Sequence, residues 1–497
     1  MIKKLALENF QGFADYLEVW LAPLTLIFGP NSSGKSSLIR SLLMLQQSVE
    51  NVVAGPQNFV MRGNSIDLAS FSNVINRHEI ERLLSIGISA PAILPSFMRV
   101  NPGRNETQGP PSHLERIDDV FYKVSASQDG ITSIHFEITF SAEAPNGPAF
   151  WKPKTGTVGV KLSRHENGSL WIEEFFGAEI LDDWYLESIR NSDSGLDSSP
   201  FAAEERKIPV VFPSKQDWEN ILSSTRLRGL FLTGGNPSAR NDESFARGPA
   251  EAIELLLRIL RGSISRSLEG ITHVKSLRDI PERLLIVDDS DTDGRQSQLH
   301  PRRRRQPSHD VVSEWITKLT KGQYELRTVE FESQEVGFLG RLRARHLFDT
   351  KTQTQVSFRD VGVGLSQVLP IIEALEVAQM GAGRDGLSSM KTVLIEQPEL
   401  HLHPRMQADL MDLMIGVAGD STRGVQIIAE THSENMVLRL QKRIREGTIR
   451  REDVAIIYAD RDTEGNNKLT PLIMDDSGDF LEPWPLSFAD VRVQDLF

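Results

Sequence analysis

Short runs of apolar residues alternate with polar turns along most of the chain, and their spacing predicts an α/β protein. Alternating apolar positions over residues 5–10 predict a first strand, and the run 24–28 predicts a second, buried strand. After about residue 325, short apolar strands alternate with helical segments, which is typical of a doubly wound fold. Between residues 118 and 180, period-2 segments joined by Asp129-Gly130 and Asn167-Gly168 predict antiparallel hairpins.

These patterns divide the chain into three parts. Residues 1–85 and 331–497 are expected to form the two halves of one α/β domain, and residues 86–330 an insertion of hairpins followed by helices. Residues 287–309 begin acidic and end in the run Arg302–Arg305 between prolines, which is the composition of a linker. Two interpretations of the four arginines stay open: they belong to a solvated linker, or they bind phosphate groups of a nucleic acid.

The segment Gly29-Pro-Asn31-Ser32-Ser33-Gly34-Lys35-Ser36 matches the Walker A pattern GxxxxGK[ST] at every fixed position and follows a buried strand. A strand, a glycine-rich turn and a helix that begins near Lys35 direct backbone N–H groups and a helix dipole at one small space, which suits phosphate. Lys35 is expected to reach the β- and γ-phosphates of ATP, and Ser36 to ligate Mg²⁺, with Ser37 beside it. The alternative is a glycine turn before an ordinary helix, and the matching strand, loop and helix context argues against it.

Two later apolar strands end in polar residues. Residues 392–395 lead into Glu396-Gln397-Pro-Glu399, and residues 425–429 lead into Glu430-Thr-His432-Ser. Because the carboxyl ends of neighbouring parallel strands meet at one edge of a sheet, Glu396, Gln397 and His432 are expected beside the Walker A loop. A third element contains Gly364 and Ser366 and opens an apolar helix, which makes another anion site. Since the chain's own loop already supplies one site, this element is expected to contact the nucleotide of a second subunit.

Together these motifs resemble the non-transporter ABC ATPases. The resemblance is carried by Asn9-Phe-Gln-Gly-Phe13, the Walker A loop, Pro-Glu-x-x-Leu-His-Pro after the Walker B strand, and Thr-His-Ser in the switch loop. They are similar to the SMC and RecF group and, closer still, to the OLD-like ATPases of bacterial anti-phage systems such as Gabija and Septu. The match covers residues 1 to about 80 and about 350 to 497.

The resemblance implies the fold of an ABC ATPase head. This is a P-loop α/β domain with a mixed sheet and an antiparallel β-subdomain, here with a β-plus-helical insertion between Walker A and Walker B. It also implies that two heads enclose two ATP molecules, each bound by Walker A of one head and by the signature segment around Ser366 of the other.

Two positions depart from the family pattern. The family usually ends the Walker B strand with Asp then Glu, whereas this chain has Glu396 and Gln397. Glu396 can still serve the Mg²⁺, but a glutamine cannot accept a proton and at best orients water. Glu399 is an alternative carboxylate if its loop turns inward. Slow hydrolysis or a nucleotide-locked dimer is therefore predicted. The second departure is in the signature segment, where Gly364-Leu-Ser366-Gln replaces the usual Leu-Ser-Gly-Gly.

Amino-acid composition excludes several classes of protein and of site. The 497-residue chain contains no cysteine, which excludes disulfides and thiolate metal sites. A formal net charge of -13 argues against a protein that coats nucleic acid over its whole surface, although a local basic channel is compatible with it. No apolar stretch reaches the roughly 18 residues that a membrane span needs, and the N-terminus is typical of a strand, so a cytoplasmic location without membrane contact is expected.

Two further clusters favour structural interpretations. His401 and His403 lie near Glu399 and allow a metal site, but a polar loop at the Walker B end is favoured because this loop recurs in the family without metal. Asp460-Arg-Asp462 follows an apolar strand and is similar to part of a Toprim nuclease domain. Too few residues follow to complete that domain, so a solvated strand tip is favoured and no nuclease is predicted in this chain.

The sequence therefore predicts an ATPase that binds ATP and Mg²⁺, forms a head-to-tail dimer with a second copy on ATP, and passes its nucleotide state to a protein effector. By resemblance only, the effector is a nuclease or toxin in prokaryotic anti-phage defence. Two alternatives stay open. One is a non-hydrolysing ATP-bound scaffold, for which Gln397 is the discriminating residue, and the other is a DNA-repair head that grips duplex DNA.

Overall fold

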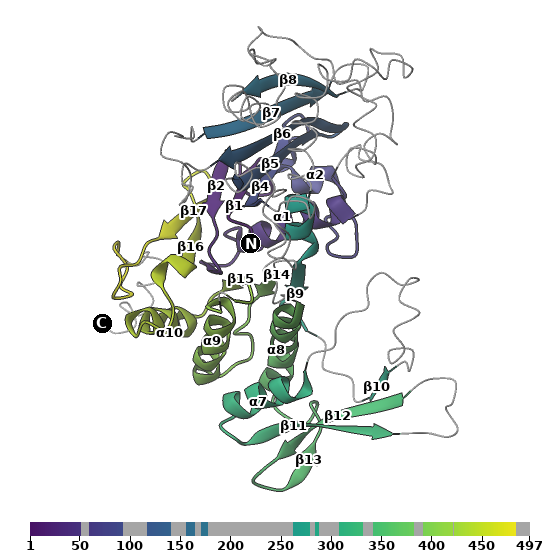
Figure 1. Ribbon diagram of the computed structural model, residues 1–497, viewed down its shortest axis with the longest axis vertical. Coiled ribbons are helices and arrows are strands. Elements are labelled where there is room, and N and C mark those ends of the chain that lie inside the picture. The colour runs from purple at the N-terminus through teal and green to yellow at the C-terminus, as the bar shows by residue number, and fades with distance from the viewer. Residues whose placement is uncertain are drawn as a thin grey trace, which may run out of the picture.

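A computed structural model describes residues 1–50, 59–92, 117–140, 156–164, 170–176, 262–278, 284–287, 308–331, 341–381, 391–420 and 422–483. The expected Asn167-Gly168 turn and the Arg302–Arg305 run lie outside these residues. Figure 1 shows an antiparallel sheet above a central sheet, and a third, smaller sheet at the opposite end of the molecule. The central sheet carries the Walker A loop, so its construction decides where the site lies.

The central sheet has six strands in the order β17-β16-β3-β15-β14-β9. Neighbouring strands are parallel except for the pair β16 and β17. Strands β3 and β15 are buried along their whole length, as expected of a parallel sheet that is covered on both faces. The bounds are β3 (Leu24–Phe28), β9 (Ile271–Val274), β14 (Lys391–Glu396), β15 (Val425–Thr431), β16 (Val454–Arg461) and β17 (Asn467–Leu472).

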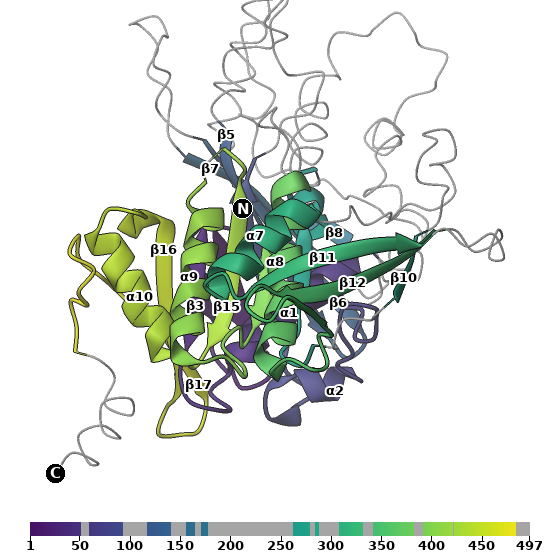
Figure 2. The same cartoon turned by 90° about the horizontal axis from the view of Figure 1, so that it is seen from below.

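Helices cover both faces of this sheet. Ile27 on β3 packs in one apolar core with α1, while Leu26 and Phe28 pack in a second core with α8, α9 and α10. Successive side chains of a strand point to opposite faces, so one short strand contributes to both cores. The predicted doubly wound α/β arrangement is confirmed, and α8, α9 and α10 lie in a row along the sheet (Figure 1, Figure 2). The helices are α1 (Lys35–Glu50), α7 (His309–Leu319), α8 (Val363–Gly381), α9 (Pro404–Ala418) and α10 (Glu434–Arg445).

The antiparallel sheet has seven strands in the order β2-β1-β4-β5-β6-β7-β8. The predicted hairpin at Asp129-Gly130 is confirmed, because Ser127 of β5 pairs with Gly130 of β6. Between β1 and β4 the chain also forms two short helices, α2 (Phe71–Val74) and η2 (Asn76–His78). The strands are β1 (Lys4–Glu8), β2 (Leu17–Trp20), β4 (Leu84–Pro91), β5 (Ile117–Ser127), β6 (Gly130–Phe140), β7 (Gly156–Arg164) and β8 (Leu170–Phe176).

The division expected between residues 85 and 86 differs from this sheet. That position falls inside β4, which pairs with β1 on one side and β5 on the other. The hairpins therefore extend the N-terminal sheet instead of starting a separate body. The expected division after residue 330 likewise falls inside β11, and β9, from the middle of the expected insertion, is an edge strand of the central sheet.

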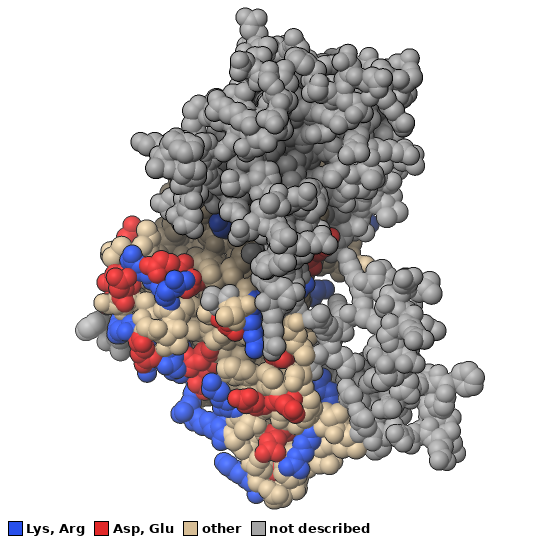
Figure 3. Space-filling model, in the orientation of Figure 1, with Lys and Arg blue, Asp and Glu red and all other residues tan. Residues whose placement is uncertain are grey.

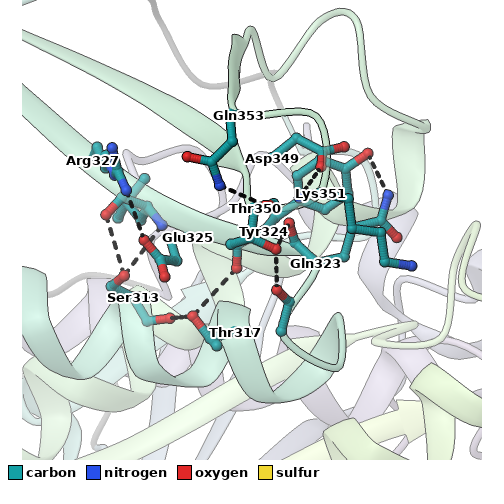
Figure 4. A network of polar contacts seen from close by, with 12 residues as sticks. Ser313, Thr317, Gln323, Tyr324, Glu325, Arg327, Asp349, Thr350, Lys351 and Gln353 are labelled. Atoms are coloured by element: carbon teal, nitrogen blue, oxygen red, sulfur yellow. Dashed lines mark hydrogen bonds and ion pairs between the residues drawn. The ribbon is translucent and has the colours of Figure 1, made fainter.

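The third sheet is built from β10 (Leu284–Val287), β11 (Tyr324–Phe331), β12 (Arg341–Asp349) and β13 (Thr354–Val356). Helix α7 is fixed to it by side-chain hydroxyls. Ser313 Oγ donates to the Leu326 carbonyl at 3.2 Å, and Thr317 Oγ1 donates to the Tyr324 carbonyl at 3.2 Å (Figure 4). A last short helix, η8 (Arg451–Asp453), leads into β16.

Helix α8 is largely apolar. It is the one helix of the described residues that is long and apolar enough to cross a membrane, over Val363–Met380 with a mean hydropathy of 1.2. The window contains Glu373 and Glu376, so it is not a continuous apolar run of the kind that the sequence lacks. Within the fold, 61% of that window is buried, and its side chains pack in the core below the central sheet. Helix α8 is therefore a core helix of this structure.

Candidate nucleotide-binding site

The Walker A loop lies between β3 and α1 and depends on two glycines. Gly29 has φ +149, and a Cβ there would lie 2.1 Å from the Ala459 carbonyl oxygen. Gly34 has φ +93, and a Cβ there would lie 2.2 Å from Nδ2 of Asn467. Both positions therefore exclude any side chain. The loop can close tightly over the end of the sheet and turn its N–H groups toward the start of α1.

Lys35 is a buried cation at this loop. Its ammonium donates to the Gly29 carbonyl at 3.1 Å and to the Pro30 carbonyl at 2.5 Å. Burial lowers the pKa of Lys35, while the carboxylates of Glu430 and Glu399 oppose that shift. The amine is thus a charge removed from water and held inside the loop, where an anionic ligand would pair with it.

The serines of the loop have different partners. Ser33 Oγ donates to the Pro30 carbonyl at 2.9 Å, and Ser37 Oγ donates to Oε1 of Gln11 at 2.6 Å. The Ser36 hydroxyl lies near the Glu430 carboxylate, whose pKa is raised by burial and partly lowered by Ser36, and Asn31 and Ser32 are exposed. The structure therefore brings Ser36 together with an acid, whereas Ser33 and Ser37 stabilise the loop and its contact with the N-terminal segment.

Glu396 ends β14 and is held by the segment after β9. Its Oε1 is 2.9 Å from His273 Nε2, and its Oε2 accepts from the Ser276 backbone N–H at 3.2 Å. Burial raises the pKa of Glu396, but the His273 hydrogen bond and charge, the Ser276 N–H and Arg40 outweigh burial, so the net shift is downward. Glu396 is an ionised carboxylate whose two oxygens already have donors.

Gln397 follows in a left-handed conformation, with φ 43. Its backbone N–H donates to the Glu430 carbonyl at 2.9 Å, which continues the pairing of β14 and β15. Nη2 of Arg278 donates to the carbonyls of Glu396 and Gln397, at 2.5 and 3.2 Å. Gln367 on α8 joins the same cluster, because its Nε2 donates to the Arg278 carbonyl at 2.8 Å. The Walker B end is thus connected to the signature helix through one buried arginine.

Glu399 connects the Walker B loop to the switch loop. Its Oε2 accepts from Thr431 Oγ1 at 2.7 Å, and its Oε1 accepts from the His432 backbone N–H at 2.7 Å. Both oxygens of the carboxylate are therefore used to hold the next loop. This placement differs from the alternative in which Glu399 turns inward toward an attacking water.

The imidazole of His432 lies near the backbone of Gly29 in the Walker A loop. Burial and the charge of Lys35 lower its pKa, and Glu399 and the Gly29 contact only partly oppose this shift. The imidazole is therefore neutral near pH 7. Ser433, the next residue, caps α10 by accepting from the Met436 N–H at 3.2 Å, which fixes the direction of the switch loop.

The signature segment has its serine turned inward. Ser366 is 0% exposed, and its hydroxyl donates to the Val363 carbonyl at 2.7 Å. A Cβ on Gly364 would lie 2.6 Å from the His401 carbonyl oxygen, so this turn packs against the Walker B loop. The expected contact of Ser366 with the nucleotide of a second subunit stays a prediction, and the exposed residues at this end of α8 are Arg359, Asp360, Gly362 and Val363.

The remaining candidates act within the chain. His403 Nδ1 accepts from the Arg405 N–H at 3.3 Å and caps α9, and the described residues hold no group of three or more His, Asp or Glu side chains that fits a metal ion. Asp462 Oδ1 accepts the N–H groups of Glu464 and Asn466 and shapes the β16–β17 turn. This turn is more than a solvated tip, because Arg461 Nε donates to the Ser32 carbonyl at 3.0 Å.

Sequence reasoning missed four residues of this neighbourhood: Glu430, Arg278, His273 and Arg461. Glu430 is the informative one, because a glutamate directly after the apolar run 425–429 and before a switch histidine is an available signal. It was interpreted as a polar strand end, yet the structure buries it at 3% exposure. Arg278 and His273 contact the Walker B end, and Arg461 contacts the Walker A loop. No pattern in the sequence around these three residues indicates those contacts.

Two protein-family profiles match the chain. One, described as "AAA domain, putative AbiEii toxin, Type IV TA system", matches residues 171–438, and the other, described as "AAA ATPase domain", matches residues 1–90. No curated protein matches the chain.

Among solved structures, the chain is similar to three SMC heads. The first, an SmcHead bound to the C-winged helix domain of ScpA, has TM-score 0.37 and 13% identity, with 96% of this chain and 98% of that chain covered. The second is an Smc head with an extended coiled coil, bound to the C-terminal domain of ScpA, from Pyrococcus furiosus, with TM-score 0.37, 11% identity and coverage of 100% and 99%. The SMC head from Thermotoga maritima has TM-score 0.33, 11% identity and coverage of 95% and 98%.

The first family profile spans more than half of the 497 residues. It includes the signature helix, the Walker B strand and the switch loop, while the second profile includes the Walker A loop. Both describe AAA ATPase domains, in agreement with a loop that holds a buried lysine between a parallel strand and a helix. The chain belongs to the AAA-domain ATPase family that the first description names.

Proposed function

We propose that this ATPase binds ATP with Mg²⁺ at the loop 29–36, dimerises head-to-tail on ATP, and transmits its nucleotide state to a protein effector. The observation that carries the proposal is the meeting of three distant segments at one loop. Lys35 holds the loop carbonyls, His432 contacts Gly29, and Glu430 contacts Ser36. A phosphate chain needs this combination of a cation, N–H groups and a polar rim.

The residues present also fit a divalent cation. The Ser36 hydroxyl lies against Glu430, and Glu396 and Glu430 are register partners on neighbouring strands. Hydroxyl and carboxylate oxygens are the donors that Mg²⁺ prefers. When bound, Mg²⁺ neutralises the charge of the phosphates. Lys35 supplies a second positive charge, and the left-handed turn at Ser32, with φ 60, leaves the loop open to the phosphates.

Hydrolysis is proposed to be slow, because the residue after Glu396 is Gln397. A glutamine amide can orient a water molecule, but it has no site that accepts the proton of that water. Glu399 already accepts two hydrogen bonds from the switch loop. His432, which lies beside Gly29, is proposed to contact the terminal phosphate. The non-hydrolysing scaffold is the limiting case of this chemistry.

Dimerisation is proposed to use the start of α8. Val363 is 51% exposed there, beside the exposed Gly362, and the first N–H groups of a helix attract an anion. The buried Arg278 and Gln367 connect this helix to the chain's own Walker B end. If the start of α8 contacts a phosphate of the nucleotide held by a second subunit, that contact would also reach this chain's own nucleotide site.

The effector and the pathway are proposed from the resemblance to anti-phage ATPases, and with them the cytoplasmic location. The family description names a toxin of a toxin–antitoxin system, which agrees with an effector that harms the cell or the phage. The DNA-binding alternative has less support, because Lys and Arg side chains are interspersed with Asp and Glu over the described part of the face in Figure 3. A duplex would favour a stripe of one sign.

The nucleotide site is tested by calorimetric titration of ATP into wild type, Lys35→Ala and Lys442→Ala. Lys442 is the matched control, because its ammonium lies on the surface 3.7 Å from Glu446. Loss of a charged hydrogen bond predicts an affinity at least about tenfold lower for Lys35→Ala, and wild-type affinity for the control. Equal affinities in all three proteins would refute the assignment of the site.

The dimer is tested by light scattering with and without ATP. Val363→Glu is expected to leave ATP affinity unchanged and to prevent ATP-dependent dimerisation, because it places a carboxylate at the helix start where the partner's phosphate is proposed to bind. Leu438→Glu on α10 is the control, since Leu438 is a comparably exposed apolar residue at 46%. A Val363→Glu protein that still dimerises on ATP would contradict the proposed interface.

A further inference from the structure

Glu430 is a buried carboxylate beside the Walker A loop. It is the second-last residue of β15 and is 3% exposed. Its backbone takes part in the ladder on both sides, where it pairs with Ile27 of β3 and Glu396 of β14. The backbone therefore fixes the position of this side chain under the loop, between the strand that delivers Lys35 and the strand that delivers Glu396.

One oxygen of this carboxylate lacks a partner within the described structure. The Ser36 hydroxyl lies near the group, but Oε2 is buried without a hydrogen-bond donor from the described residues. Burying an unpartnered carboxylate oxygen costs free energy. An apolar residue would avoid that cost. Such a group is typical of a site that takes a positive ligand.

The neighbouring acid Glu396 differs in this respect. Both of its oxygens have donors from the chain, His273 at 2.9 Å and Ser276 at 3.2 Å. A cation that bound Glu396 directly would have to displace at least one of them. Glu430 has a free oxygen and already touches the hydroxyl of Ser36, which is the residue whose type and position in Walker A suit Mg²⁺.

We propose that Glu430, together with Ser36, holds the divalent cation that accompanies the nucleotide, and that Glu396 acts at one remove through its fixed carboxylate. This inference rests on the proposed function, because it requires a nucleotide in the loop. It assigns the cation to the switch strand β15 instead of the Walker B strand β14. In this arrangement the acid Glu430 lies near the phosphates on β15. The presence of glutamine instead of glutamate at position 397, after β14, does not affect it.

The experiment measures cation and nucleotide separately in the full chain. Mn²⁺ is the probe, and its binding is followed by electron paramagnetic resonance in the presence of a non-hydrolysable ATP analogue. The affinity of the analogue is measured by calorimetry in EDTA. The proteins are wild type, Glu430→Gln, Glu396→Gln and Glu376→Gln. Glu376 is the matched control, because it is a buried glutamate of α8, 7% exposed, whose charged neighbour is Arg423.

Glu430→Gln is expected to weaken Mn²⁺ binding at least about tenfold, the lower end of what loss of a supporting group costs a metal site. Its affinity for the analogue in EDTA is expected to stay within about twofold of wild type, which a collapsed site would not allow. Glu376→Gln is expected to match wild type. Glu430→Asp, which keeps the charge and shortens the side chain, is the second variant and is expected to bind Mn²⁺ more weakly than wild type.

Three results would overturn the reasoning at different points. Wild-type Mn²⁺ affinity in both Glu430→Gln and Glu430→Asp would remove the cation from Glu430. Loss of Mn²⁺ binding only in Glu396→Gln would assign it to the Walker B acid. Failure of wild type to bind the analogue at all would refute the proposed function itself, and the measurement in EDTA shows that outcome without reference to the metal.

Discussion

Replacement of Glu399 gives the sharpest test of how the two catalytic loops are held together. Its carboxylate accepts from the Thr431 hydroxyl and from the His432 backbone N–H, both at 2.7 Å. Thr431 is 0% exposed, so its hydroxyl has no access to water once the acceptor is removed. We compare Glu399→Ala, which removes both acceptors, with Glu399→Gln, which keeps one carbonyl oxygen.

The two distances set the magnitude. A hydrogen bond to a charged acceptor contributes about 1.5–3 kcal/mol to stability, and a buried donor left alone costs about 1–3 kcal/mol. Glu399→Ala is therefore expected to lower the free energy of unfolding by about 3 kcal/mol. Glu399→Gln loses about half as much, because its amide presents an N–H group to one of the two donors. The entropy of unfolding of a 497-residue chain corresponds to about 1 °C per kcal/mol, so the alanine variant should melt roughly 3 °C lower.

The assay is thermal unfolding followed by circular dichroism, with steady-state ATP hydrolysis measured on the same samples. Glu81→Ala, at an exposed glutamate, is the control and should melt with wild type. If Glu399 were instead a catalytic base, Glu399→Gln would abolish ATP turnover without a change in melting temperature. That pattern, or a Glu399→Ala protein that melts with the control, would refute the structural role.

Three further predictions follow from single contacts. Gln397→Glu should raise ATP turnover at least about tenfold by supplying a proton acceptor, and steady-state rates no higher than wild type would contradict this. Gly34→Ala should prevent calorimetric ATP binding, because its Cβ would lie 2.2 Å from Asn467 Nδ2 at φ +93, and retained affinity would contradict the loop geometry. Burial raises the pKa of Glu376 against the opposing charge of Arg423, so the folded state holds this proton more tightly than the unfolded chain does. Stability should therefore fall as pH rises from the unfolded toward the folded pKa, and Glu376→Gln should reduce the difference in melting temperature between about pH 4 and about pH 8.

Local pattern was sufficient to predict the Walker A loop and its sheet. The strand, the glycines and Lys35 are neighbours in sequence, so one short segment contains all the residues that form the anion site. The apolar strands that end at Glu396 and Thr431 were also predictable, because burial on both faces makes them apolar throughout. The carboxyl ends of these strands then had to meet at the loop.

The inward turn of Ser366 could not be predicted in this way. Helix α8 is largely apolar, and its few polar residues do not gather on one side, so its sequence does not show which face meets the core. The packing of Gly364 against the His401 carbonyl decides the rotation, and these two residues are brought together only by the tertiary fold. The position of β4 across the expected boundary near residue 85 has a related cause, since nothing near β4 indicates that β5 will pair with it.

The role of Gln397 depends on its backbone more than on its amide. At φ 43 the residue occupies a conformation that costs a residue other than glycine about 1–3 kcal/mol. The Glu430 carbonyl and the guanidinium of Arg278 hold it there, at 2.9 and 3.2 Å. Arg278 is in turn held by Gln367 on the signature helix. A movement of α8 would therefore reach the Walker B turn directly. If the proposed dimer forms through the start of α8, its formation would shift the position of residue 397 even though the glutamine side chain cannot take a proton.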